Sequence, residues 1–348
     1  MSAFLNELLT ERGCLLADGA MGTSLFALGL ETGDCPELWN LEHPERVRSV
    51  HRDYLEAGSD IILTNSFGGT RFRLDLHAFG ERCGALNEAA AGVARAEADS
   101  YMAETGRRVL VAGSVGPTGE LMQPLGMLTD ETAKAAFREQ IEALARGGAD
   151  LIWIETMSAP EEARAAIEAA GATSLPIVCT MTFDTNRRTM MGYRPEDLPN
   201  IGEGLAVTPS AVGANCGIGP SELLDSVLEI ASASDPRTIV VAKGNCGVPR
   251  YVDGHIRYDG SPAIMADYAR LARDAGARII GGCCGSTAEH VRAMAEALKS
   301  HPLGEEPSRE VIADALGKPW NSGVPGELSL EADDGVRRRR RRARARPG

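Results

Sequence analysis

Short apolar runs rich in β-branched residues alternate along this chain with longer amphipathic stretches. Each run ends in a glycine-rich or polar turn, and the stretch that follows carries apolar residues at helical spacing. Residues 131–148 and 265–276 are two such helical stretches, rich in Ala, Glu and Arg and ending in glycine, which is common at a helix C-terminus. The predicted strands lie at 14–19, 60–67, 108–116, 150–157, 176–183, 211–217, 238–247 and 277–285.

Eight consecutive strand–helix units predict a TIM (β/α)8 barrel over residues 1–300, with a doubly wound parallel sheet as the alternative. The sequences EAGSD, RGGAD and DAGAR stand before the second, fourth and eighth strands, which indicates one helix-to-strand turn used three times. The 348 residues of the chain suit a barrel of this kind.

Residues able to do chemistry follow the predicted strands at their C-terminal ends, where TIM barrels carry their active sites. These residues are Asp18, Glu155, Cys216, Cys283 and Cys284. The sixth and eighth strands are two places apart in an eight-stranded barrel, so the cysteines at their ends can converge.

Three converging thiolates without an evident fourth protein ligand are typical of an open zinc site. An alternative is a redox-active pair formed by the adjacent Cys283 and Cys284. We expect Cys14, Cys83 and Cys179 to be packed thiols, because their neighbours are apolar or helical. Cys246 ends the seventh strand and is either a packed thiol or a spare thiol near the metal.

An open three-thiolate site suits a substrate that is itself a thiol. Zinc binds sulfur well and favours the deprotonated form of a thiol whose ordinary pKa is about 8.5. Three anionic ligands leave the centre negatively charged, so the bound sulfur keeps much of its nucleophilicity. The sequence therefore favours sulfur attack on a methyl group.

Four motifs carry a family resemblance, in order along the chain: DGAMGT (18–23), IETMS (154–158), GANCG (213–217) and GGCCG (281–285). Over about residues 10–300 the chain resembles the zinc-dependent homocysteine S-methyltransferases. That family includes the betaine–homocysteine methyltransferases and the homocysteine-binding domain of cobalamin-dependent methionine synthases.

The resemblance implies that Cys216, Cys283 and Cys284 bind zinc and that the homocysteine sulfur completes the tetrahedron. It also implies that Asp18 and Glu155 hold the substrate amino group, and that backbone amides from Gly19 onward face its carboxylate. The product would be methionine.

Two amides and one histidine have more ambiguous roles. Asn215 and Asn245 occupy family-like positions and either order the site or cap local backbone, and Asn215 is assigned to the substrate-binding residues. His290 fits the first turn of the last barrel helix and is expected to be structural.

The methyl donor depends on finer details of the resemblance. Betaine enzymes carry cage aromatics at places that here hold Gly68, Thr156 and Cys35, and only the nearby Trp39 could partly substitute. Segments 113–126, 181–184 and 215–220 are more similar to the methionine synthase type. The favoured donor is therefore methylcobalamin on a separate corrinoid protein, with a folate-binding protein as a further partner; betaine and S-methylmethionine are the alternatives.

Composition and charge limit the other classes. The net charge is −13 although the last dozen residues carry eight arginines, so an acidic body makes nucleic acid an unlikely partner. No apolar run is long enough for a membrane span, and the N-terminus lacks the pattern of a secretory signal, which predicts a cytoplasmic protein.

Residues 301–348 lose the barrel pattern. Their Pro, Gly and charge runs predict little fixed structure apart from a short helix near 308–316. The basic run Arg337–Arg346 is either a solvated tail or an arm that docks on an acidic partner or RNA.

Overall fold

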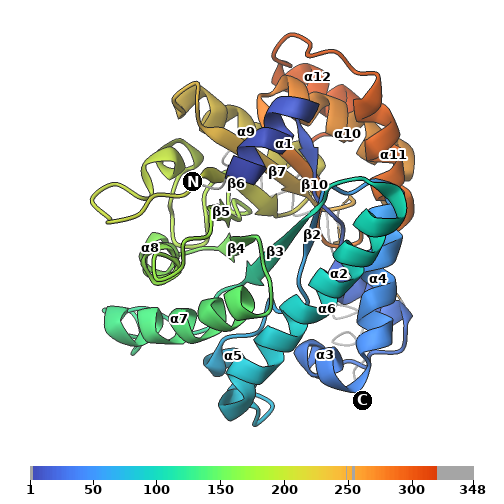
Figure 1. Ribbon diagram of the computed structural model, residues 1–348. Helices are drawn as coiled ribbons and strands as arrows, with labels where there is room; N and C mark the ends of the chain where they lie inside the picture. The colour runs from blue at the N-terminus through green and yellow to red at the C-terminus, as the bar shows by residue number, and fades with distance from the viewer. Residues whose placement is uncertain (1–2, 248, 253–254, 320–348) are drawn as a thin grey trace, which may run out of the picture.

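The computed structural model describes residues 3–247, 249–252 and 255–319, and it contains a barrel of eight parallel strands (Figure 1). Around the barrel the strand order is β1, β10, β7, β6, β5, β4, β3 and β2, and a parallel bridge between Ala17 and Ile61 joins the two ends. The strands are β1 (Leu15–Leu16), β2 (Ile61–Leu63), β3 (Leu110–Val115), β4 (Leu151–Met157), β5 (Ile177–Met181), β6 (Ala211–Cys216), β7 (Ile239–Gly244) and β10 (Ala277–Gly282). The predicted TIM barrel is confirmed.

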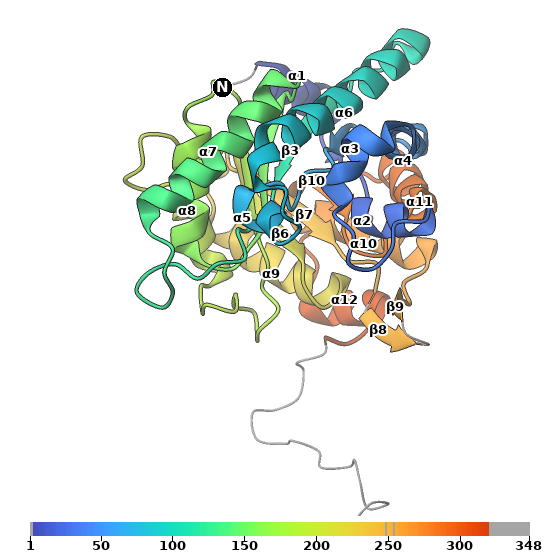
Figure 2. The ribbon, with the colours of Figure 1, turned by 90° about the horizontal axis from the view of Figure 1, so that it is seen from below.

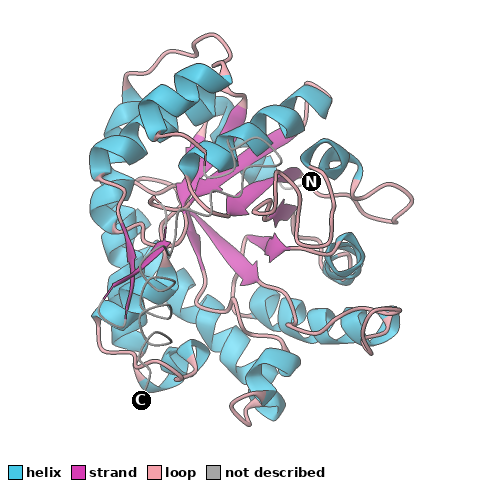
Figure 3. Cartoon of the chain, turned by 180° about the vertical axis from the view of Figure 1, so that it is seen from behind, coloured by secondary structure: helices cyan, strands magenta, loops and turns pink. Residues whose placement is uncertain are grey.

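Helices surround the strands, as the view from behind shows (Figure 3). Many of them begin at a proline or after a capping hydroxyl: Pro44, Pro160, Pro220 and Pro262 occupy first turns, and Thr129 caps α7. The helices are α1 (Ala3–Arg12), α2 (Met21–Ala27), α3 (Trp39–Glu42), α4 (Pro44–Ala57), α5 (Arg71–Asp75), α6 (Cys83–Thr105), α7 (Asp130–Arg146), α8 (Pro160–Ala170), α9 (Pro220–Ala233), α10 (Pro262–Asp274), α11 (Ala288–Lys299) and α12 (Arg309–Leu316). Between β5 and β6 the described helix is the 3-10 helix η3 (Pro195–Asn200).

The barrel has two apolar layers because strand side chains alternate between its faces. One layer lies between the strands and the helices, and the other fills the barrel interior. On β7, Ile239 and Val241 belong to the interior layer. Leu5, Leu8 and Leu9 of α1 join that same layer, so α1 closes the N-terminal end of the barrel (Figure 1).

The turn predicted before three strands is present at all three places. Gly58, Gly148 and Gly276 have φ values of 112°, 100° and 95°, in the left-handed region that glycine adopts without strain. The three repeated sequences therefore encode one backbone conformation.

Some boundaries differ from the prediction. β2 ends at Leu63 and not at residue 67. The Thr64 amide still donates to the Ala112 carbonyl of β3, but Asn65 donates its side-chain amide to the carbonyl of Pro36 in another loop. An antiparallel hairpin, β8 (Pro249–Val252) with β9 (His255–Tyr258), was not predicted; it follows β7 and lies at the edge of the molecule in Figure 2.

The expected short helix beyond the barrel is present as α12, and its residue Ile312 is fully buried in the outer core. Residues 301–319 are thus described beside the barrel, and the domain boundary at residue 300 stays a prediction. The tail at 320–348, including Arg337–Arg346, lies outside the described residues. Within the described ranges, every helix is too short or too polar to cross a membrane.

Candidate metal and substrate site

Three cysteines meet at the C-terminal ends of β6 and β10, which flank β7. Cys216 and Gly282 both pair in register with Gly244 of β7, and the Cys283 amide donates to the Gly244 carbonyl at 2.6 Å. The Sγ atoms of Cys216, Cys283 and Cys284 all lie within 4.8 Å of one another, and those of Cys216 and Cys284 are 3.9 Å apart. The predicted convergence is confirmed.

Two loops are shaped to aim these sulfurs at one point. Cys216 itself has a left-handed φ of 63°, which is uncommon for a residue other than glycine. The side chain of Asn245 joins the loops: its Oδ1 accepts from the Cys284 amide at 3.0 Å, and its Nδ2 donates to the Gly217 carbonyl at 2.5 Å. Asn245 therefore orders the cysteine loops.

The spacing of the sulfurs fits a zinc ion. Zn–S bonds of about 2.3 Å in a tetrahedron place sulfurs about 3.8 Å apart, close to the Cys216–Cys284 distance of 3.9 Å. Hydrogen bonds from Cys216 and Cys283 hold the pKa of the Cys284 thiol well below its usual range. The same contacts raise the pKa of Cys216.

Asp18 and Glu155 are buried carboxyl groups in the same cavity. Oδ2 of Asp18 accepts from the Leu63 amide at 2.7 Å, and Oε1 of Glu155 accepts from the Ser114 hydroxyl at 2.5 Å. Burial raises the pKa of Asp18 to about 6 and that of Glu155 to about 7. Both carboxyl groups thus change charge between about pH 6 and about pH 7. A bound ammonium group would favour their ionised forms.

Lys243 is a buried cation beside these acids, and it was not predicted from the sequence. Its Nζ lies 3.4 Å from Oδ1 of Asp18 and 3.4 Å from the Gly19 carbonyl. Burial alone would lower the pKa of Lys243, but the Asp18 carboxylate and other nearby anionic groups more than offset this and raise it. The alternation of β7 could have indicated it, since residues 239, 241 and 243 share the inward face.

Asn215 supports the acid at the end of β4. Its Oδ1 accepts from the Thr156 amide at 2.8 Å, and its Nδ2 donates to the Thr156 hydroxyl at 2.7 Å. Thr156 has a left-handed φ of 61°, an uncommon conformation for a β-branched residue. Asn215 thus holds a strained residue next to Glu155, which is the ordering role considered for it.

These groups line one cavity of about 500 Å³ at the C-terminal mouth of the barrel. Gly19 is part of its wall, where a Cβ atom would lie 2.6 Å from the Ser286 carbonyl oxygen, so only glycine fits. The cavity brings together the predicted residues Asp18, Gly19, Glu155, Cys216, Cys283 and Cys284. Asn215 stands behind them, within 3.9 Å of the Cys283 sulfur.

The other residues considered from the sequence, Cys246, His290 and Trp39, have structural roles. Cys246 is 1% exposed and its thiol donates to the Gly260 carbonyl at 3.0 Å, so it packs apart from the cluster. His290 forms a reciprocal cap with Thr287 at the start of α11, as expected. Trp39 is buried in the outer core, and the residues that line the cavity do not include it.

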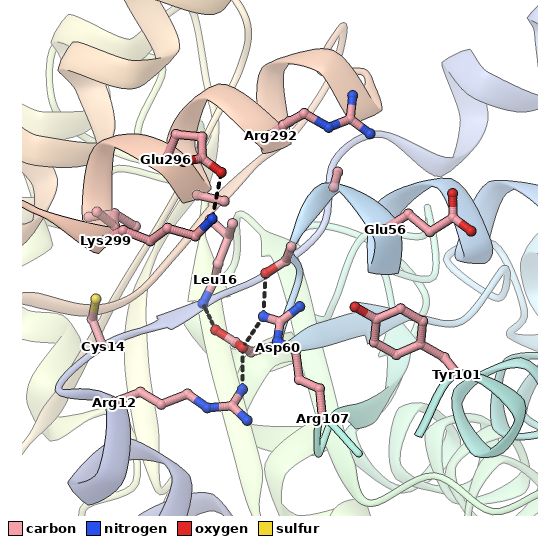
Figure 4. A pocket seen from close by; sticks show the side chains of 14 residues that line it. Arg12, Cys14, Leu16, Glu56, Asp60, Tyr101, Arg107, Arg292, Glu296 and Lys299 are labelled. Atoms are coloured by element: carbon pink, nitrogen blue, oxygen red, sulfur yellow. Dashed lines mark hydrogen bonds and ion pairs between the residues drawn. The ribbon is translucent and has the colours of Figure 1, made fainter. Parts of the chain in front are cut away.

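A second cavity, of about 430 Å³, lies at the opposite end of the barrel (Figure 4). Asp60 is central to it: its carboxylate accepts from the Leu16 amide at 2.8 Å and pairs with both Arg12 and Arg107. Residues at the N-terminal face of a TIM barrel usually serve stability. The pairs tie α1 and the segment before β3 to the start of β2.

Comparison with known proteins agrees with this geometry. The family model described as homocysteine S-methyltransferase matches residues 15–298. The metallated form of the homocysteine methyltransferase MmuM from Escherichia coli is similar at 29% identity and a TM-score of 0.71, covering 84% of this chain and 99% of that chain. Its oxidized form gives 29% identity and a TM-score of 0.72, with 84% and 98% covered.

Proposed function

This chain belongs to the homocysteine S-methyltransferase family and is a methyltransferase that acts on homocysteine; we propose that it makes methionine with a zinc ion held by Cys216, Cys283 and Cys284. One observation carries the proposal: a three-sulfur cluster and two buried acids line the same cavity. Three protein sulfurs are one fewer than the four ligands of a structural zinc site.

The chain's own residues would bind and orient the substrate. Asp18 and Glu155 would accept the α-ammonium group, and backbone amides from Gly19 onward would face the carboxylate. Bound zinc would supply Lewis acidity that lowers the pKa of the homocysteine thiol. A lone pair of the substrate sulfur then forms the new C–S bond, the bond from methyl carbon to donor breaks with its electron pair leaving on the donor, and the thiol proton goes to solvent.

The donor we favour is methylcobalamin carried by a separate corrinoid protein, with a folate-binding protein as a further partner. Two features of the cavity mouth support this donor. A Cβ atom at Gly68 would lie 2.9 Å from Oε1 of Glu37, so any larger residue there would require the Glu37 carboxylate to move. The rings of Phe26 and Phe67, which line the cavity, are 48% and 40% exposed, so the mouth is open to a large donor.

A small cationic donor, betaine or S-methylmethionine, is the second candidate. It is favoured by Asp34 and Glu37, two acids that line the cavity near its aromatic rings. Whichever of these donors is used, the cytoplasm is the location we propose for the protein.

Metal analysis and a donor panel test the proposal. The purified chain should retain one zinc per molecule and convert homocysteine to methionine when methylcobalamin on a corrinoid protein is supplied. Turnover with betaine or S-methylmethionine alone would show that this compound, and not methylcobalamin, is the methyl donor. A chain that binds no zinc and instead cycles between dithiol and disulfide would support the redox alternative.

A further inference from the structure

Lys243 is an ammonium group buried at the inner end of the substrate cavity. It follows Ile239 and Val241 on the inward face of β7, is 3% exposed, and lines the cavity with Asp18 and Glu155. A buried lysine is costly unless its charge and its hydrogen-bond donors are satisfied. The groups around Lys243 therefore indicate which kind of ligand group it contacts.

The contacts of Lys243 leave donor capacity unused. An ammonium group has three donors. Within the described residues, Nζ makes one hydrogen bond, to the Gly19 carbonyl at 3.4 Å, and approaches Oδ1 of Asp18 at 3.4 Å. Both distances exceed the roughly 2.7–2.9 Å of a close charge-assisted hydrogen bond. Oδ1 of Asp18 is itself buried without a hydrogen-bond partner in the described structure.

A cation and an acceptor with unused capacity, side by side in one cavity, match the two charges of an amino acid. A second cationic side chain in the lining, Arg73, belongs to α5 and lies against Gly119 in the loop after β3, which places it at the mouth. Lys243, in contrast, is anchored to the Gly19 carbonyl, in the loop whose amides would face the substrate carboxylate.

We propose that the Lys243 ammonium group binds the α-carboxylate of the substrate, while Asp18 and Glu155 accept its α-ammonium group. The inference rests on the proposed function, because it concerns how homocysteine is held. It makes Lys243 a substrate-binding residue that selects an amino-acid thiol over a simple thiol. A role confined to balancing the charge of Asp18 would be different, since it would affect only the ammonium subsite.

Binding measurements on the purified metal-containing chain separate these roles without a methyl donor. We would measure the Kd of homocysteine by calorimetry at a pH of about 8.5, above the usual range of carboxyl groups. Two analogues isolate the subsites: 4-mercaptobutyrate keeps the carboxylate and lacks the amino group, and 3-aminopropanethiol keeps the amino group and lacks the carboxylate. Lys243→Met preserves the length of the side chain and removes its charge, and Lys299→Met, at an exposed lysine of α11, is the matched control.

Lys243→Met should weaken binding of homocysteine and of 4-mercaptobutyrate by about tenfold or more, the usual effect of losing a hydrogen bond to a charged group. Binding of 3-aminopropanethiol should weaken less, and Lys299→Met should change none of the three. Unchanged binding of 4-mercaptobutyrate would overturn the inference in favour of action through Asp18. Equal losses for all three ligands would also overturn it, in favour of a general structural role.

A second variant protects the test against misfolding. Lys243→Met alone leaves the buried Asp18 without its counter-charge, whereas Asp18→Asn/Lys243→Met removes both charges. The double variant should bind 4-mercaptobutyrate about tenfold more weakly than Asp18→Asn alone does. Equal binding by the two would contradict the inference. If the wild-type chain bound neither homocysteine nor 4-mercaptobutyrate, the proposed function itself would fail.

Discussion

Asn215→Ala tests whether the site depends on a strained residue that a buried amide holds in place. The side chain of Asn215 is 1% exposed and makes two hydrogen bonds to Thr156, at 2.8 and 2.7 Å. Thr156 has a φ of 61° and follows Glu155 directly. A residue held in this region costs about 1–3 kcal/mol and persists only where its surroundings impose it.

The structure sets the size of the effect. Each lost hydrogen bond contributes about 0.5–1.5 kcal/mol, so the pair contributes about 1–3 kcal/mol. Relaxation of Thr156 to an ordinary φ would return part of that energy but would move Glu155 away from its position. We therefore expect the variant to lose about 2 kcal/mol of unfolding free energy.

Two measurements test this expectation. At roughly 2 °C per kcal/mol for a chain of this size, the Tm should fall by about 4 °C. The KM for homocysteine should rise about tenfold, because Glu155 would lose its proposed charged contact with the substrate ammonium group. Asn200→Ala, at an exposed asparagine, is the control and should change neither value.

A second substitution separates strain from lost packing. Thr156→Gly in the Asn215→Ala background should recover part of the Tm, because glycine adopts the left-handed conformation freely. An Asn215→Ala variant with wild-type Tm and KM would refute the reasoning. Failure of Thr156→Gly to recover stability would show that the loss came from packing and not from backbone strain.

Three further predictions concern the metal, the pH dependence and the opposite end of the barrel. Cys284→Ala should abolish zinc retention and turnover while the far-ultraviolet circular dichroism stays that of a folded barrel; a zinc-containing active variant would exclude the cysteine site. Burial raises the pKa of Asp18 to about 6 and of Glu155 to about 7, so both groups are neutral below these values and charged above them. The ratio of KM for homocysteine to KM for 4-mercaptobutyrate should therefore fall as pH rises through this range, and a constant ratio would contradict the assignment of these acids to the ammonium group. Asp60→Ala should lower the free energy of unfolding by about 3 kcal/mol, the low end for breaking a buried ion pair, because the two arginines are 20% and 30% exposed. A thermal melt should show this loss while kcat stays unchanged. A lowered kcat would mean that this end of the barrel affects the substrate site.

Most of the architecture follows from local patterns. β-branched runs followed by amphipathic stretches specify alternating strands and helices, and the repeated turn sequences specify a left-handed glycine at 58, 148 and 276. The convergence of Cys216 with Cys283 and Cys284 was also predictable, because strand order places the sixth and eighth strands on either side of the seventh. The hairpin β8–β9 was not predicted, and β2 was predicted too long, since Asn65 directs its side chain to the loop at Pro36.

By itself, the sequence determined the barrel, the cluster of three cysteines and the two acids at strand ends, because each depends on residue type and on periodicity along the chain. Only the tertiary structure decided how these groups are held and balanced. The contact of Lys243 with Asp18 joins β7 to the loop after β1, far apart in the sequence, and the support of Thr156 by Asn215 joins two strands. Such contacts depend on the register and closure of the barrel, which bring distant side chains to the same height inside it, and no local pattern of residues encodes that distance.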